Sequence, residues 1–226
     1  MITHTLKTLG AAVTLGLAAT AVQAAPVSSV GGVNLANNGQ ISNSCGFCTT
    51  YDFNNGLLPA VYSGNGAVVT GSIAGQWAQP TSPTSPNTTA YLVTPAQGGS
   101  GSVTLTLPGM ANYFGFFAGS IDLYNSISFF NGVTLMGTVT GADLIALPNP
   151  DLIPGNQQQA AYYNIAFLTG GFNRVVLSSQ GIAFETDNHS VGTVQIPVPG
   201  AAALMLSGLF GMVFASRRQK KAVQVA

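Results

Sequence analysis

The sequence predicts an all-β domain, an antiparallel two-sheet β-sandwich of jelly-roll type, flanked by an N-terminal signal peptide and a C-terminal transmembrane helix. Short runs of β-branched and aromatic residues are broken throughout by Gly, Asn, Pro and Ser, which is typical of β proteins with many turns. About nine such runs follow one another at spacings of roughly 10–20 residues, as in sandwiches. An up-and-down barrel is the alternative fold.

Two segments give the clearest strands. In residues 101–108, Val103, Leu105 and Leu107 alternate with polar residues, so one apolar face is expected to contact a core. Residues 113–119 are apolar on both faces, which predicts a central strand that is covered on both sides.

A hairpin is expected where Asn131-Gly132 separates the runs 127–130 and 133–139, because Asn-Gly between two strands favours a type I′ turn. The only helical candidate is one turn at 142–147, and the Pro-, Thr- and Ser-rich residues 79–89 are expected to form a long exposed loop. Further strands are expected at 67–73, 91–94, 163–168, 174–178 and 182–185.

The charge distribution excludes one class of function. The 226 residues contain 6 Lys+Arg and 6 Asp+Glu, so 5% are charged, where about 25% is usual. Between Lys7 and Arg217 the only base is Arg174, whereas all the acids lie there. No basic patch remains in this interior to neutralise phosphates, which excludes a nucleic-acid binder.

The N-terminus is expected to be a signal peptide over residues 1–24. A weakly basic start precedes an apolar run from Leu9 to Val22, and small residues before Ala25 fit cleavage by signal peptidase. A buried N-terminal helix is the alternative interpretation.

The C-terminal residues 196–226 combine three features. Pro197-Val198-Pro199 precedes the uncharged run 200–215, which is about 24 Å long as a helix. Snorkelling of the stems of Arg217 and Arg218 lets it span a bilayer. By the positive-inside rule the basic tail stays cytoplasmic, which places residues 25–199 outside, with the exported domain at 25–195.

This order of a Pro-x-Pro motif, an apolar helix and an Arg-rich tail resembles the PEP-CTERM sorting signal of exosortase-dependent bacterial surface proteins, in its Val-Pro-x-Pro variant. The resemblance covers about the last 30 residues. It implies recognition by a membrane-embedded exosortase, cleavage near Pro197–Pro199 and release of the domain to the surface or matrix of a Gram-negative bacterium. A plain tail anchor is the alternative. Residues 113–122, 129–132 and 172–188 also resemble strands of exported proteins that carry this signal, a group with no settled activity.

Cys45 and Cys48 are the only cysteines, and in an oxidising compartment they are expected to form a local disulfide. A thioredoxin-like role needs the pair at a helix start, whereas the flanking residues favour a loop and a strand.

The acids offer two hypotheses. Glu185 and Asp187 are expected to share one strand face, as the catalytic acids of jelly-roll glycanases do, although no further glutamate follows. Alternatively, oxygen ligands bind calcium, and no other cofactor is expected. The candidate ligands are Asp52, Asp122, Glu185, Asp187 and Asn188, with solvated turn acids as the simpler interpretation.

His189 and Trp77 are the remaining candidates for chemistry or binding. His189 lies in an Asp-Asn-His-Ser sequence typical of a polar turn, which argues against a catalytic triad with Asp187. Trp77 lies beside the loop 79–89 and is the best exposed candidate for stacking on a sugar ring, whereas most of the tyrosines are expected in the core.

Together these patterns predict a non-catalytic, exported and exosortase-processed protein that associates with extracellular polysaccharide in a biofilm matrix. An envelope glycan-active enzyme that uses Glu185 and Asp187, and a self-assembling surface structural protein, are the alternatives.

Overall fold

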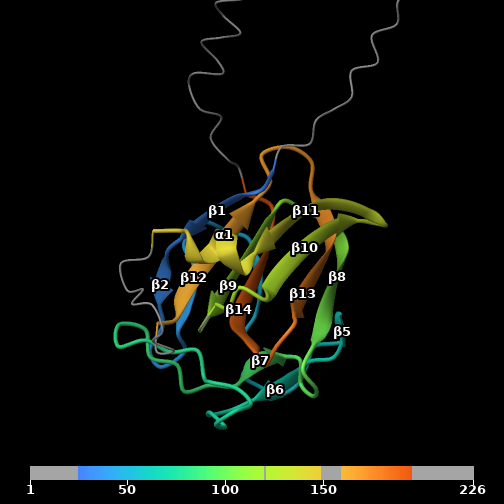
Figure 1. Ribbon diagram of the computed structural model, residues 1–226. Coiled ribbons are helices and arrows are strands. Elements are labelled where there is room, and N and C mark those ends of the chain that lie inside the picture. Colours follow the sequence, from blue (N-terminus) through green and yellow to red (C-terminus); the bar gives the residue numbers. More distant parts are fainter. Residues whose placement is uncertain (1–24, 120, 149–158, 195–226) are drawn as a thin grey trace, which may run out of the picture.

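The computed structural model describes residues 25–119, 121–148 and 159–194 (Figure 1). They form a predominantly β structure with antiparallel sheets and one short helix, which confirms the predicted fold class at this level. The predicted signal peptide and the sorting signal with its helix lie outside the described residues. Among the described residues, no helix has the length and apolarity that a membrane span requires.

The larger sheet has seven strands, and every pairing within it is antiparallel. Strand β14 is central, with β9 along one edge and both β7 and β4 along the other. In spatial order the strands are β1 (Val27–Val30), β12 (Ala161–Ala166), β9 (Tyr113–Ala118), β14 (Phe184–Gly192), β7 (Tyr91–Thr94) and β6 (Ala67–Val69), with β4 (Thr49–Tyr51) paired to β14.

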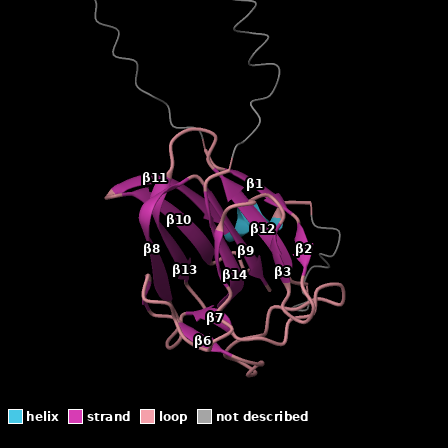
Figure 2. Cartoon of the chain, turned by 180° about the vertical axis from the view of Figure 1, so that it is seen from behind, coloured by secondary structure: helices cyan, strands magenta, loops and turns pink. Residues whose placement is uncertain are grey.

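The second sheet has five strands and packs on the first through the core (Figure 2). A separate hairpin of β2 (Gly32–Asn34) and β3 (Gln40–Ser42) lies against β12 and β14. The helix α1 (Gly141–Ile145) follows the five-stranded sheet and has a capping box between Thr140 and Asp143. The five strands are β11 (Thr134–Thr140), β10 (Asn125–Asn131), β13 (Phe172–Ser179), β8 (Gly101–Ala111) and β5 (Tyr62–Gly64).

The prediction for β9 is confirmed, because all six of its residues are buried. Its inner face meets the opposite sheet where the rings of Phe114 and Phe129 lie 6.1 Å apart. Phe129 also packs on Phe167 and Phe172, with ring centroids 5.2 and 4.9 Å away. One aromatic cluster therefore joins the two sheets.

Strand β14 is longer than expected and contains a bulge. It extends from Phe184 to Gly192, whereas the sequence predicted a strand over 182–185. The register shifts between Asp187, which pairs with Phe117, and Ser190, which pairs with Gly115. The extra residue is accommodated at Asn188, whose φ is 49°, a left-handed conformation that Asn tolerates better than most residues.

The predicted hairpin is present, but its turn is displaced by one residue. Asn131 pairs with Thr134, so Gly132 and Val133 occupy the turn. Only Gly132 of these two has a positive φ, 59°, which is the pattern of a type II′ turn. The predicted type I′ turn is wrong because it would place a positive φ at both central residues.

The sequence indicated a strand directly after Cys48, which is β4, but it did not predict β1, β2, β3 or β5 as strands. Three of these missed strands have only three residues, and β1 has four, so alternation could not reveal them. The predicted exposed loop at 79–89 is also corrected, because Ser82, Ser85 and Asn87 are buried. This segment covers the outer face of the larger sheet.

Replacing Phe129 by alanine is expected to lower the free energy of unfolding by about 3–5 kcal/mol, because it leaves a cavity where the two sheets meet. Urea unfolding of the full chain in a mild non-ionic detergent measures the change. The control is Val133→Ala in the exposed turn, which should change stability by less than about 0.5 kcal/mol. Equal effects of the two variants would contradict the assigned core.

Candidate functional site

An open pocket of about 490 Å³ lies where the loop 72–78 meets the start of β14. Its walls come from three separate segments of the chain. They are lined by Ser72, Ile73, Ala74, Gly75, Gln76, Trp77, Ala78, Asp122, Tyr124, Ile182, Ala183 and Glu185. Neither Lys nor Arg is among these lining residues.

Trp77 lines both this pocket and a smaller one of about 280 Å³, as Gln76 and Ile182 also do. A short bridge between Ile73 and Trp77 closes the loop that carries it, with hydrogen bonds in both directions. Trp77, which the sequence indicated as the best exposed aromatic candidate, is partly buried. Its Nε1 is buried and has no hydrogen-bond partner among the described residues.

Glu185 closes the floor of the pocket from β14. The backbone N–H of Ala78 donates to its Oε1 over 2.9 Å, which ties the loop to the strand. Its Oε2 is buried and has no hydrogen-bond partner among the described residues. Burial raises the pKa of this carboxyl to about 7, and the nearby Asp122 carboxylate adds to the rise.

Tyr124 and Asp122 form another part of the pocket wall. The Tyr124 hydroxyl donates to the carbonyl of Ile182 over 3.2 Å, so it links this wall to the residues before β14. Burial, together with its interaction with Asp122, raises the pKa of Tyr124 to about 12. The wall therefore presents a neutral phenol beside a half-buried carboxylate.

Asp187 lies on the same outer face of β14 as Glu185, as predicted, but it does not line the pocket. The segment 79–89 covers it, and its Oδ2 accepts a hydrogen bond of 2.8 Å from the amide of Asn87. Its Oδ1 accepts one of 2.7 Å from the N–H of Asn188. Burial raises the pKa of Asp187 to about 7 despite these bonds. The two acids of the enzyme hypothesis thus do not share one cleft.

The five predicted calcium ligands do not gather at one place. Asp122 lies near Glu185, and Asp52 lies near Asp187 but is exposed and caps its own turn through Asn54. The side-chain amide of Asn188 donates to the carbonyls of Asn38 and Gln40. Within the described ranges, no group of three or more His, Cys, Asp or Glu residues is arranged to hold a metal ion. Calcium binding therefore stays a prediction without a formed set of acidic ligands.

His189 belongs to the core, which corrects the predicted polar turn. The bulge at Asn188 turns its ring inward, where it packs edge-on against Phe53 and Phe114 with centroids 5.1 and 5.3 Å away. Its Nδ1 hydrogen-bonds the hydroxyl of Tyr62 over 2.9 Å. Burial lowers the pKa of His189 to about 3, so the ring is neutral, and it lies on the opposite face of β14 from Asp187.

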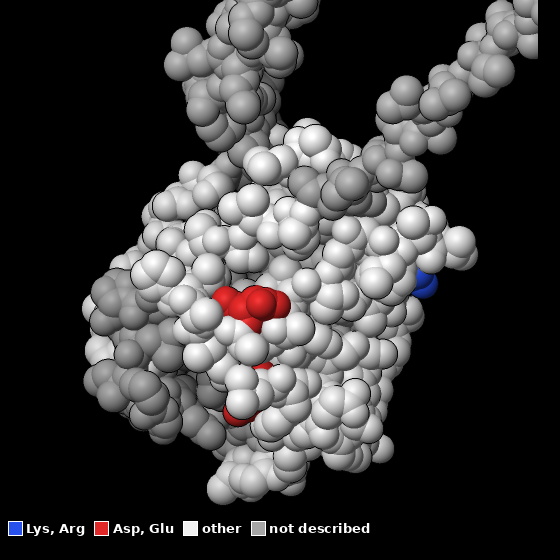
Figure 3. All heavy atoms as spheres, turned by 45° about the horizontal axis from the view of Figure 1, so that its top comes forward, with Lys and Arg blue, Asp and Glu red and all other residues white. Residues whose placement is uncertain are grey.

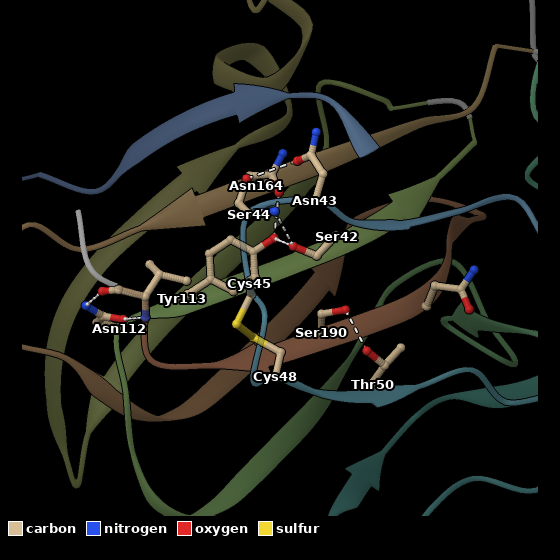
Figure 4. Close-up of a disulfide and its surroundings, with 12 residues drawn as sticks. Ser42, Asn43, Ser44, Cys45, Cys48, Thr50, Asn112, Tyr113, Asn164 and Ser190 are labelled. Atoms are coloured by element: carbon tan, nitrogen blue, oxygen red, sulfur yellow. Dashed lines mark hydrogen bonds between the residues drawn. A yellow bond between two sulfur atoms is a disulfide. The ribbon is translucent and has the colours of Figure 1, made fainter. Parts of the chain in front are cut away.

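The predicted disulfide is present between Cys45 and Cys48 (Figure 4). It closes a tight loop before β4, and this loop lies against Gly192 at the end of β14. Two side-chain hydrogen bonds anchor the surrounding chain to the larger sheet, Ser42 to Tyr113 and Thr50 to Ser190.

Comparisons with known proteins identify no family. No family model and no curated protein matches the chain. One similar solved structure is CpGH89CBM32-6 of Clostridium perfringens, at 16% identity and a TM-score of 0.29, over 56% of this chain and 92% of that one. Another is the enzymatically active domain of bacteriophage CBA120 tailspike protein 4, at 14% identity and a TM-score of 0.34, over 69% and 21%. Likenesses at these TM-scores carry no argument about fold or function.

The two buried carboxyls predict an unusual pH dependence. Because their pKa values are about 7 in the folded chain and about 4 when unfolded, the folded state holds protons more tightly. The free energy of unfolding should therefore fall as the pH rises from about 4 to about 7, by on the order of a few kcal/mol. His189 opposes this trend, because its stabilising effect is lost as the pH falls from about 6.5 towards 3. Maximal stability is expected near pH 4.

Asp187→Asn tests this expectation, because it removes one of the two titrating carboxyls and should markedly flatten the decline above pH 4. Urea unfolding of the full chain in detergent at pH 4.5, 5.5, 6.5 and 7.5 gives the slope. The control is Asp143→Asn, since the pKa of that exposed carboxyl is lowered and it titrates below this range. An unchanged slope in Asp187→Asn would show that Asp187 is not protonated in the folded state.

Proposed function

We propose that this chain is an exported, exosortase-processed and non-catalytic cell-surface or matrix protein that associates with neutral exopolysaccharide through the Trp77 pocket. Export and processing rest on the two terminal segments of the sequence. The disulfide, which persists in oxidising compartments, supports a location outside the cytoplasm. The two sheets around one core support a β-sandwich of jelly-roll type as the scaffold.

The observation that carries the binding proposal is the composition of the pocket. Trp77 and Tyr124 supply aromatic surface, which stacks on the C–H faces of sugar rings. Ser72, Gln76 and Asp122 supply hydrogen-bonding groups for hydroxyls. The carboxyls of Asp122 and Glu185, with no Lys or Arg in the lining, disfavour an acidic glycan. A neutral polysaccharide is the ligand that this combination fits best.

Trp77→Ala is expected to abolish retention of the full chain on the exopolysaccharide of the producing organism, because it removes the central aromatic surface. Affinity electrophoresis in a gel containing this polysaccharide and a mild detergent measures retention. The matched control is Phe47→Ala, which removes another aromatic side chain far from the pocket and should leave retention unchanged. Retention of Trp77→Ala at the level of the unsubstituted chain would exclude the pocket as the binding site.

Running the same gel with calcium and with a chelator tests the calcium hypothesis, since retention that depends on calcium would support the oxygen ligands predicted above. Shortening of the polysaccharide during incubation, lost in Glu185→Gln, would replace this proposal by the enzyme alternative. Light scattering of the chain without polysaccharide tests self-assembly.

A further inference from the structure

The described chain ends at a fixed place on the domain. Asn112, at the junction of β8 and β9, holds Val194 by two hydrogen bonds of 2.9 and 2.8 Å, and its N–H donates to Gly192. The first strand, β1, begins at the same end, because Val27 pairs with Ala166 and Phe167 donates to the carbonyl of Asn112. Both ends of the described chain thus leave the domain together, as the top of Figure 1 shows.

The two most exposed large apolar side chains of the described residues, Phe47 and Val133, lie at this end. We call Phe47, Met110, Val133 and Leu168 the apolar rim. Phe47 is 99% exposed at the tip of the disulfide loop, and Val133 is 95% exposed at the tip of the hairpin. Met110 and Leu168 are about half exposed, on strands and loops that adjoin Asn112.

Both loops of the rim are tied to neighbouring strands of the domain. The disulfide loop touches Gly192, which accepts a hydrogen bond from Asn112. Asn173, the second residue of β13, holds the hairpin tip, because its side-chain oxygen accepts a hydrogen bond from the backbone N–H of Gly132. Two short loops, one closed by a disulfide and one by a tight turn, therefore expose large apolar side chains to solvent. Removing this apolar surface from water would be favourable.

The rim has one base at its hairpin tip, while the exposed Asp52 follows β4, the strand after the disulfide loop. Arg174 is the only Lys or Arg among the described residues, and it lies over the ring of Phe130 at 4.3 Å and donates to Gly132 at the hairpin tip. Asp122, Asp143 and Glu185 lie at the opposite ends of strands β9, β11 and β14 from the rim. In Figure 3 the basic atoms lie at one edge of the face that is shown, and the acidic atoms lie near its middle.

We propose that the apolar rim lies in the headgroup region of the membrane, with Phe47 inserted, while the chain is anchored. The occupant is a lipid surface because the uncharged run 200–215 begins only six residues after Val194, a reach of at most about 20 Å. Apolar and aromatic side chains beside a cation are the surface that enters a lipid interface. The disulfide loop then orients the domain on the membrane before cleavage, with the Trp77 pocket facing away. This inference rests on the membrane anchoring contained in the proposed function.

The full chain reconstituted in phosphatidylcholine vesicles, with and without brominated lipid, tests the proposal. Trp77 is the only tryptophan and lies at the far end, so the unsubstituted chain gives the background emission. Phe47→Trp should add emission that brominated lipid quenches by more than half. Leu123→Trp is the matched control, since Leu123 is also an exposed apolar loop residue but lies beside the pocket, and its emission should stay unquenched.

Flotation of the vesicles separates the two proposals. If the chain floats with the vesicles but Phe47→Trp is not quenched, the membrane anchor stands and the insertion of the rim is overturned; a blue-shifted but unquenched emission would show that a protein surface covers Phe47 instead. If the chain does not float with the vesicles, the anchor fails, and the proposed insertion fails with it. Mass spectrometry without reductant confirms that the variant retains the Cys45–Cys48 disulfide.

Discussion

The bulge of β14 at Asn188 is the constraint on which the rest of the structure depends. One extra residue opposite β9 reverses the alternation of side chains along the most central strand. Without it, His189 would face the polar outer layer and Ser190 the phenylalanine core. With it, Glu185, Asp187 and Ser190 all remain on the outer face, and His189 packs among Phe53 and Phe114. The left-handed conformation that this requires falls on Asn, which adopts it at little cost.

The outer face of the larger sheet holds two acidic side chains that are buried under covering segments of the chain. Two carboxyls lie buried there, and each is held by the covering segments: Glu185 by the N–H of Ala78, and Asp187 by the amide of Asn87. Burial raises both pKa values to about 7, so the charged forms are disfavoured. The covering loop over Glu185 also carries Trp77, and so the pocket arises where a buried acid fixes an aromatic side chain at the surface.

The pocket and the exit of the chain lie at different ends of the domain. One end holds the pocket, with its carboxyls and aromatic rings, and the other holds the apolar rim, the disulfide and the exit of the chain at Val194. This separation suits the proposed sequence of events, in which the domain is first held at the membrane and later released to a polysaccharide matrix. A ligand at the pocket would not compete with a membrane at the rim.

The sequence alone determined the features that depend on neighbouring residues. It predicted the β class, the strands around residues 101–108, 113–119 and 133–139, the single helical turn and the Cys45–Cys48 disulfide, since alternation and spacing are local properties. It also singled out Trp77 and Glu185 as candidates, from residue type and position.

Only the tertiary structure decided how these candidates are used. No local pattern shows that residues 72–78, 122–124 and 182–185 meet at one pocket, or that Asp187 is covered while Glu185 lines it. The bulge that sends His189 into the core depends on pairing with β9, more than 70 residues away in the chain. Short strands such as β2, β3 and β5 form only because other strands and loops supply their partners, and an isolated run of three residues carries too little alternation to reveal them.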